Sequence, residues 1–231
     1  MTPIQLYTYQ TPNGHKASIM LEETGLRYDV HIVDIEKGEQ NSPAFLALNP
    51  NNKIPVIVDP DRNRTVIESG AILLYLAERS GVLRPRHEIE AGLTLQWILF
   101  QAAHVGPTLG QLWNYKIFAP EKIGTVIDRF ERETGRVLRV LDGQLGASRY
   151  LVGGRYGAAD VMTWPWIHAA AISWASGSIP IPTSPAGTTR SDRGRPSNAA
   201  FSSPIWRNAR PPPDRALDRP TKETRNGCSL P

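Results

Sequence analysis

The chain contains a single cysteine among its 231 residues, Cys228, which lies close to the C-terminal end. One cysteine excludes a framework of disulfide bonds, a Cys-x-x-Cys redox pair and a cluster of thiolates around a metal ion. Any redox chemistry at this chain must therefore use a thiol that belongs to another molecule.

Long hydrophobic runs are also absent. The longest apolar stretch, VMTWPWIHAAAISW, contains Pro165 and His168 and is shorter than the roughly 20 residues that a membrane-spanning helix needs. The N-terminus has no basic segment followed by an apolar core, so we expect no secretory signal and a cytoplasmic protein without a membrane partner. The five histidines are scattered without the spacing of metal ligands, so we expect no metal.

Most of the chain carries no excess of positive charge, although the net charge of the whole chain is +4 and its pI is about 9.3. Residues from Ser178 onward hold nine Lys or Arg and four Asp or Glu, a net of +5, which leaves −1 for the residues before them. A basic surface for nucleic acid is therefore not expected on the body of the protein.

The segment YQTPNGHK at residues 9–16 contains an Asn-Gly pair, which between two strands would signal a hairpin turn. The residues before it, PIQLYTY, fit a strand, but Ala17, Met20 and Leu21 after it recur at helical spacing. We therefore predict a strand-to-helix turn, with Asn13 as the N-cap and the Thr11 hydroxyl just upstream. The first turn of a helix attracts anions, although an ordinary capped turn without chemistry fits the same residues.

Short segments alternate through the first 85 residues in the order β-α-β-α-β-β-α. After the first strand and helix, we expect a strand at 28–35, a helical turn in PAFLALNP, strands at 54–59 and in DRNRTVIE, and a helix at 69–79. The first two strands need a helical crossover and should be parallel, whereas the last two are joined by a turn at 60–63 and should be antiparallel. The pattern predicts an α/β domain at residues 1–85.

Long amphipathic helices are expected from about Glu88. In EKIGTVIDRFERETGRVLRVLDGQL, apolar residues such as Ile127, Val137 and Leu141 keep to one face, and the segment before it fits an antiparallel partner. A third helix should begin near Asp160. The pattern predicts an all-helical bundle domain at residues 89–176 after a linker at 83–88.

The helical pattern stops at Gly177. Ten of the twenty prolines fall at residues 177–231, which are also rich in Arg and Ser and have no amphipathic period. Such a composition predicts a disordered tail. It is also what a GC-rich gene gives when it is read out of frame, so we expect a frameshift product that leaves the helical domain incomplete and exposes apolar residues around Trp164, Trp166 and Ile172.

Two further places carry backbone or side-chain groups that suit a peptide ligand. Pro55 opens a strand and follows Ile54 in either a trans bond, which is the commoner case, or a cis bond that would turn the Ile54 backbone outward to pair with a peptide. Ser69 is expected to cap the next helix, and Glu68 beside it suits an ammonium group. Plain helix capping also accounts for Ser69.

The segments TPNGHK, NPNNKIP and ESGAILLYLAE resemble cytosolic glutathione transferases, and among them the bacterial nu-class proteins, which are glutathione-dependent disulfide reductases. The resemblance covers about residues 4–175. It implies a thioredoxin-like domain followed by a helical bundle, a homodimer, and glutathione as the substrate that reacts with a small electrophile or disulfide.

The resemblance also implies the residues of the site. Thr11 and Asn13 would face the sulfur and act as the catalytic pair, and we rank them above Tyr7 and Tyr9, of which we expect one in the core and one near the site. The residues that would bind the rest of glutathione are Gln40, Lys53, Ile54, Pro55, Glu68, Ser69 and Arg136. Of these, Ile54 would pair with the cysteinyl backbone and Glu68 with Ser69 would hold the γ-glutamyl end, while the other polar residues match positions that contact the glycyl end or a second glutathione.

A free thiol has a pKa of about 8.5, and hydrogen-bond donors at a helix N-terminus favour its thiolate form. Our hypothesis is that the glutathione thiolate attacks a disulfide or an electrophilic carbon while Thr11 and Asn13 stabilise its charge. The alternatives are a glutathione-binding or regulatory protein without turnover, and a truncated product without function.

Overall fold

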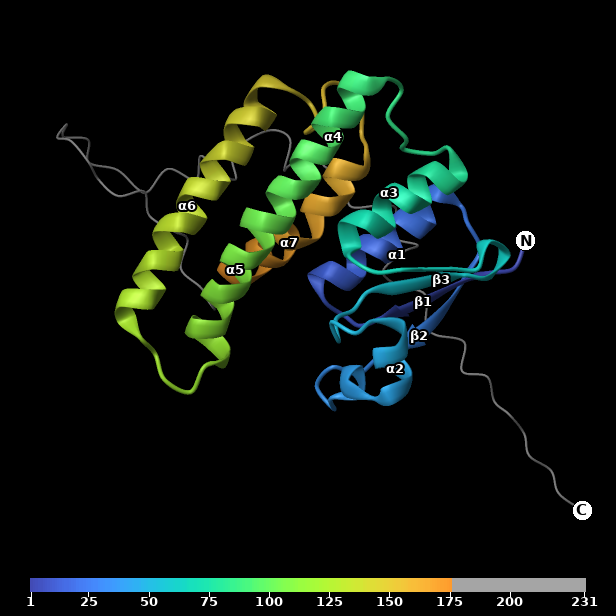
Figure 1. Ribbon diagram of the computed structural model, residues 1–231. Helices are drawn as coiled ribbons and strands as arrows, with labels where there is room; N and C mark the ends of the chain where they lie inside the picture. The colour runs from blue at the N-terminus through green and yellow to red at the C-terminus, as the bar shows by residue number, and fades with distance from the viewer. Residues whose placement is uncertain (176–231) are drawn as a thin grey trace, which may run out of the picture.

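The computed structural model describes residues 1–175, and the tail expected at 177–231 lies outside the described residues. Figure 1 shows two parts side by side, a sheet with its covering helices and a group of longer helices. We call the elements from β1 to α3 the sheet part and those from α4 to α7 the helical part.

The sheet part has four strands in the order β2-β1-β3-β4. Its elements are β1 (Ile4–Thr8), α1 (Pro12–Thr24), β2 (Tyr28–Ile32), α2 (Pro43–Leu48), β3 (Val56–Asp59), β4 (Arg64–Val66) and α3 (Ser69–Ser80). β1 is parallel to β2 and antiparallel to β3, and β3 is antiparallel to β4. This confirms the expected thioredoxin-like βαβαββα fold, although β2 ends and β3 begins inside the expected bounds.

The two faces of the sheet are covered by different helices. Alternate residues of β1 are buried, and Leu6 packs into the cluster that contains residues of α1 and α3. Tyr7 points to the other face, where it joins Phe45 of α2 and Val56 of β3. The carboxyl end of β1 is followed, after a short turn, by the N-terminus of α1.

The helical part contains α4 (Glu88–Phe100), α5 (Gly106–Trp113), α6 (Gly124–Ala147) and α7 (Ala158–Ala175), with π-helical turns η3 (Gln101–Val105) and η4 (Asn114–Phe118). The helical bundle expected from the sequence is confirmed. The expected exposure of Trp166 is wrong, because this side chain is 8% exposed within the core of the helical part. Ile172 is 56% exposed.

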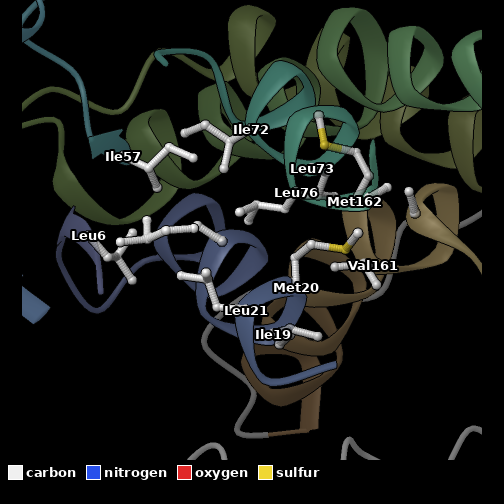
Figure 2. Close-up of a cluster of buried hydrophobic side chains, with 14 of the residues drawn as sticks. Leu6, Ile19, Met20, Leu21, Ile57, Ile72, Leu73, Leu76, Val161 and Met162 are labelled. Atoms are coloured by element: carbon white, nitrogen blue, oxygen red, sulfur yellow. The ribbon is translucent and has the colours of Figure 1, made fainter. Parts of the chain in front are cut away.

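One hydrophobic cluster contains residues of both parts. α7 packs against α1, α3 and α4, and its residues Val161 and Met162 are fully buried beside Met20 of α1 and Leu73 of α3. Figure 2 shows these side chains converging from both parts. Each such burial stabilises the fold by about 1.5 to 3 kcal/mol, so the position of α7 on α1 is strongly fixed.

We predict that Gly70→Ala and Gly143→Ala change stability in opposite directions. A Cβ at position 70 would lie 2.8 Å from Cγ2 of Ile98 in α4, whereas a Cβ at position 143 meets no atom within 4 Å. Overpacking should lower the free energy of unfolding by about 1 to 3 kcal/mol in the first variant. Loss of the helical glycine should raise it by about 0.5 to 1 kcal/mol in the second.

Urea unfolding of both variants beside the parent chain measures the two changes. Equal effects of the same sign would show that helix propensity, and not the contact between α3 and α4, decides the result at position 70.

Candidate functional site

The turn between β1 and α1 is capped by Thr11 and not, as expected, by Asn13. The backbone of Thr11 is extended (φ −134°), and its Oγ1 accepts a hydrogen bond from the amide of Gly14 at 3.1 Å. The helix begins at Pro12, because proline has the φ of a helix and needs no backbone partner at the first helical position. Since Oγ1 serves here as an acceptor, the hydroxyl hydrogen of Thr11 remains a donor.

Gly14 lets the first turn of α1 lie directly against the end of β1. A Cβ at this position would lie 2.2 Å from the carbonyl oxygen of Tyr9 and 2.5 Å from Oγ1 of Thr8. Only a residue without a side chain fits, so the glycine of TPNGHK fixes how closely Thr11 and Asn13 approach the sheet.

Lys16 is a buried amine below this turn, and sequence reasoning missed it. The residue is 1% exposed. Its Nζ donates to Oδ1 of Asn13 at 2.8 Å, to Oε1 of Gln101 in η3 at 2.7 Å and to Oγ of Ser69 in α3 at 3.4 Å. Burial lowers the pKa of Lys16 to about 7, although the nearby charge of Glu68 acts in the opposite direction.

Asn13 is held by donors from both parts of the protein. Besides the bond from Lys16, its Oδ1 accepts a hydrogen bond from Nε1 of Trp166 in α7 at 2.9 Å. An ammonium group and an indole N–H cannot accept hydrogen bonds, so the amide oxygen must face them. The Nδ2 group then faces the other way, and no residue in the described part of the chain accepts its hydrogens.

The N-terminus of α3 lies next to this arrangement through the contact between Ser69 and Lys16. Here the N-cap is Glu68 and not the expected Ser69, which is the first helical residue. Glu68 has a φ of 67°, in the left-handed region, and its exposed carboxylate makes no capping bond. The Ile54-Pro55 bond, left open by the sequence, is cis and immediately precedes β3.

The structure places the remaining predicted residues further out. Nε2 of Gln40 donates to the carbonyl of Ile35 at 3.3 Å, while its buried Oε1 has no hydrogen-bond partner in the described residues. Lys53 is exposed. Arg136 pairs with Glu133 at 2.6 Å on α6, which lies on the far side of the helical part from the sheet (Figure 1). The structure thus brings Thr11, Asn13 and Ser69 together and leaves Arg136 apart from them within one chain.

Arg136 lines a shallow hollow on α6. The hollow has a volume of about 600 Å³, and its other lining residues are Arg129, Phe130, Arg132, Glu133 and Arg139. Four of its six residues are arginines, so an anionic group would be favoured there.

Of the two tyrosines before the turn, Tyr7 packs against the cluster that contains Phe45 and Val56, and Tyr9 lies beside Gly14 at the turn. They are two positions apart and both are half-buried. The ring of Tyr7 stacks on His31 with centroids 4.6 Å apart. Burial and the nearby Asp34 raise the pKa of the Tyr9 phenol, which makes this group a poorer source of phenolate.

Residues 1–175 show neither a cluster of metal ligands nor a membrane-spanning helix. Within this range no three or more His, Cys, Asp or Glu side chains gather where they could hold a metal ion. None of the described helices combines the length and the apolar character that crossing a membrane requires.

We predict that Lys16 makes stability rise with pH between about 7 and 10. Its pKa is about 7 in the folded protein against a usual value of 10.5. In this window the unfolded chain binds more protons than the folded one, so the free energy of unfolding increases with pH. The melting temperature of the parent chain, measured relative to Lys16→Met, should therefore rise from pH 7 to pH 9.5. A constant difference would contradict the shift.

Comparison with known proteins connects this geometry to a family. The family profiles for the glutathione S-transferase N-terminal and C-terminal domains match residues 11–79 and 124–188. The disulfide-bond oxidoreductase YfcG from Escherichia coli (strain K12) is 44% identical over 171 residues, which are 72% of this chain and 80% of YfcG.

Solved structures agree with the sequence relatives. A glutathione transferase family member from Pseudomonas fluorescens pf-5, crystallised with two glutathione bound, superposes with a TM-score of 0.71 at 42% identity, covering 75% of this chain and 79% of that one. A glutathione transferase from Pseudomonas putida, with one glutathione disulfide bound per subunit, gives a TM-score of 0.71 at 39% identity over 75% and 78% of the two chains. The chain described here therefore belongs to the glutathione S-transferase family.

Proposed function

We propose that this protein is a glutathione-dependent disulfide oxidoreductase whose nucleophile is the thiolate of bound glutathione. One observation carries the proposal. The acceptor oxygens of Thr11 and Asn13 are occupied by donors of the protein itself. The Thr11 hydroxyl hydrogen and the Asn13 Nδ2 group are therefore left as donors at the N-terminus of α1, where a negatively charged sulfur is favoured.

These two donors act on the acidity of the thiol. A hydrogen bond to a charged group contributes about 1.5 to 3 kcal/mol, and one pKa unit corresponds to about 1.4 kcal/mol. Two donors aimed at the sulfur are therefore enough to bring the thiol pKa from about 8.5 to below neutrality. At neutral pH most of the bound glutathione would then be thiolate.

The rest of the tripeptide is bound by the residues around the turn. The backbone of Ile54, held by the cis bond to Pro55, pairs with the cysteinyl residue. The exposed carboxylate of Glu68 takes part in no ion pair within residues 1–175, so it is available to the γ-glutamyl ammonium, with Ser69 beside it. Gln40, Lys53 and Arg136 are proposed for the glycyl carboxylate or a second glutathione.

The reaction consumes two glutathione molecules. The first thiolate attacks one sulfur of the substrate disulfide, a mixed disulfide forms, and the other sulfur leaves as a thiolate that takes up a proton. A second glutathione thiolate then attacks the glutathione sulfur of the mixed disulfide, which releases the second substrate thiol and glutathione disulfide. The substrate gains two electrons and the two glutathione molecules lose two, so no cysteine of the protein takes part.

The occurrence of two glutathione molecules in the Pseudomonas fluorescens structure, and of glutathione disulfide in that from Pseudomonas putida, supports such a cycle. Attack on an electrophilic carbon, as in detoxification, would use the same thiolate. A protein that binds glutathione without turnover is the alternative.

We further propose that the protein is a cytoplasmic homodimer, with domains at 1–85 and 89–176. α4 presents apolar side chains to solvent, among them Ile89, Leu93 and Leu99, which are 74%, 40% and 56% exposed. A second copy that covers this face would remove them from water. Light scattering after size-exclusion chromatography measures the assembly directly.

Replacing both sulfur-facing side chains is predicted to slow catalysis and spare binding. In Thr11→Ala/Asn13→Ala, kcat/KM for reduction of a small disulfide by glutathione should fall at least about tenfold at neutral pH, because each lost donor raises the thiol pKa. Thr11→Ser keeps the hydroxyl and is the matched control. Glutathione at a hundred times its dissociation constant should still stabilise every variant by about 2.7 kcal/mol.

Three results separate the alternatives. Unchanged turnover in the double variant would refute the roles of Thr11 and Asn13. Stabilisation by glutathione without turnover in the parent chain would favour the non-catalytic alternative. No stabilisation of the parent chain would remove glutathione itself from the proposal.

A further inference from the structure

The two hydrogen bonds accepted by Asn13 come from residues on two different helices. Lys16 lies one turn further along α1, whereas Trp166 lies in α7, 153 positions away in the sequence. Both side chains donate to the amide oxygen, and neither the indole N–H nor the lysine ammonium can accept a hydrogen bond. They hold the same atom, Oδ1, and therefore set the same orientation of the amide.

The indole of Trp166 has little freedom to move. A Cβ at Gly106 would lie 3.5 Å from its Cε2, and a Cβ at Gly110 would lie 3.3 Å from its Cη2. The two glycines therefore allow the backbone of α5 to lie close to the ring. Trp113 stacks on the same indole, with centroids 5.4 Å apart and an interplanar angle of 15°. The ring is therefore fixed by the helical part, and its N–H is aimed at Asn13.

Lys16 is likewise fixed from the helical part, by Gln101. Gln101 is 1% exposed and is the first residue of the π-helical turn η3, a feature that often marks functional sites. Its Oε1 accepts from Lys16 at 2.7 Å, while its buried Nε2 has no acceptor among the described residues. The Gln101 side chain is thus placed to accept the hydrogen bond from Lys16, although its own Nε2 group has no acceptor among the described residues.

We propose that Lys16 and Trp166 are positioning residues that hold the Asn13 amide with its Nδ2 group towards a bound thiol. The helical part then sets the acidity of a thiol that is bound on the sheet part. This inference rests on the proposed function, because it assigns what orients the group that faces the sulfur.

The effect on the thiol is expected because an amide has an accepting oxygen at one end and a donating NH2 group at the other. An asparagine without fixed partners samples both orientations, and the reversed one would place Oδ1 against a negatively charged sulfur. Two donors on Oδ1 exclude that orientation. Removing either donor should therefore lower the thiolate fraction of bound glutathione even though neither residue touches the sulfur.

The test measures the pKa of the bound thiol in three pairs of proteins: the parent, Lys16→Met and Trp166→Phe, each with and without Asn13→Ala. Thiolate absorbance of the glutathione complex is titrated against pH, with the S-methylglutathione complex as the blank because it cannot ionise. Lys16→Met and Trp166→Phe, which keep an unbranched chain and an aromatic ring respectively and remove the donor, should raise the thiol pKa by about one unit, a tenfold loss of thiolate. Combined with Asn13→Ala, neither should add a further shift, because a positioning residue acts through Asn13.

Matched controls lie on the same helices. Ser18→Ala in α1 and Thr163→Val in α7 remove hydroxyls that donate to Gly14 and Ala159 of their own helices, and both should leave the thiol pKa unchanged. If Lys16→Met does not fold, Trp166→Phe with and without Asn13→Ala decides the question.

The outcomes separate this inference from the proposed function. If the parent chain does not bind glutathione, or binds it with the pKa of a free thiol, the proposed function fails. If the parent lowers the thiol pKa and the two substitutions do not change it, the inference alone fails. If their shifts are as large on the Asn13→Ala background, Lys16 and Trp166 act by another route, and the positioning role is overturned.

Discussion

The need to satisfy one buried amine organises the candidate site. Nζ of Lys16 is removed from water, and a buried amine without acceptors is very costly. Its acceptors come from α1, from the first residue of α3 and from η3 of the helical part. These partners cannot be moved apart without exposing the amine or leaving it unpaired, so the turn that holds Thr11 and Asn13 is tied to both neighbouring helices.

Much of the fold follows from local pattern, and so does the approximate place of the site. Helical spacing after TPNGHK and the turn residues between the last two strands were enough to predict the βαβαββα order. The sequence places both caps too late, by two residues in α1 (Asn13 instead of Thr11) and by one residue in α3 (Ser69 instead of Glu68). In the first case Pro12 is a natural first helical residue; in the second, Glu68 takes a left-handed φ that residue type alone does not predict.

The residues that orient Asn13 could not be found in the same way. Gln101 lies 85 positions from Lys16, and Trp166 lies 153 positions from Asn13. Only the packing of the helical part against the sheet part brings them close. A weak signal existed in Lys16 itself, which stands four residues before Met20 and so falls within the apolar stripe of α1. A lysine at such a position either extends to solvent or is buried with acceptors, and the sequence does not distinguish these cases.

The order in which the ribosome makes the two parts decides when their shared hydrophobic cluster can form. The ribosome completes the sheet part, with Lys16, long before it reaches α7, which begins at Ala158. Until then Met20 and Leu73 lack the cover that Val161 and Met162 later provide. Arrival of α7 therefore removes this apolar surface from water, and the nascent sheet part exposes it until that moment.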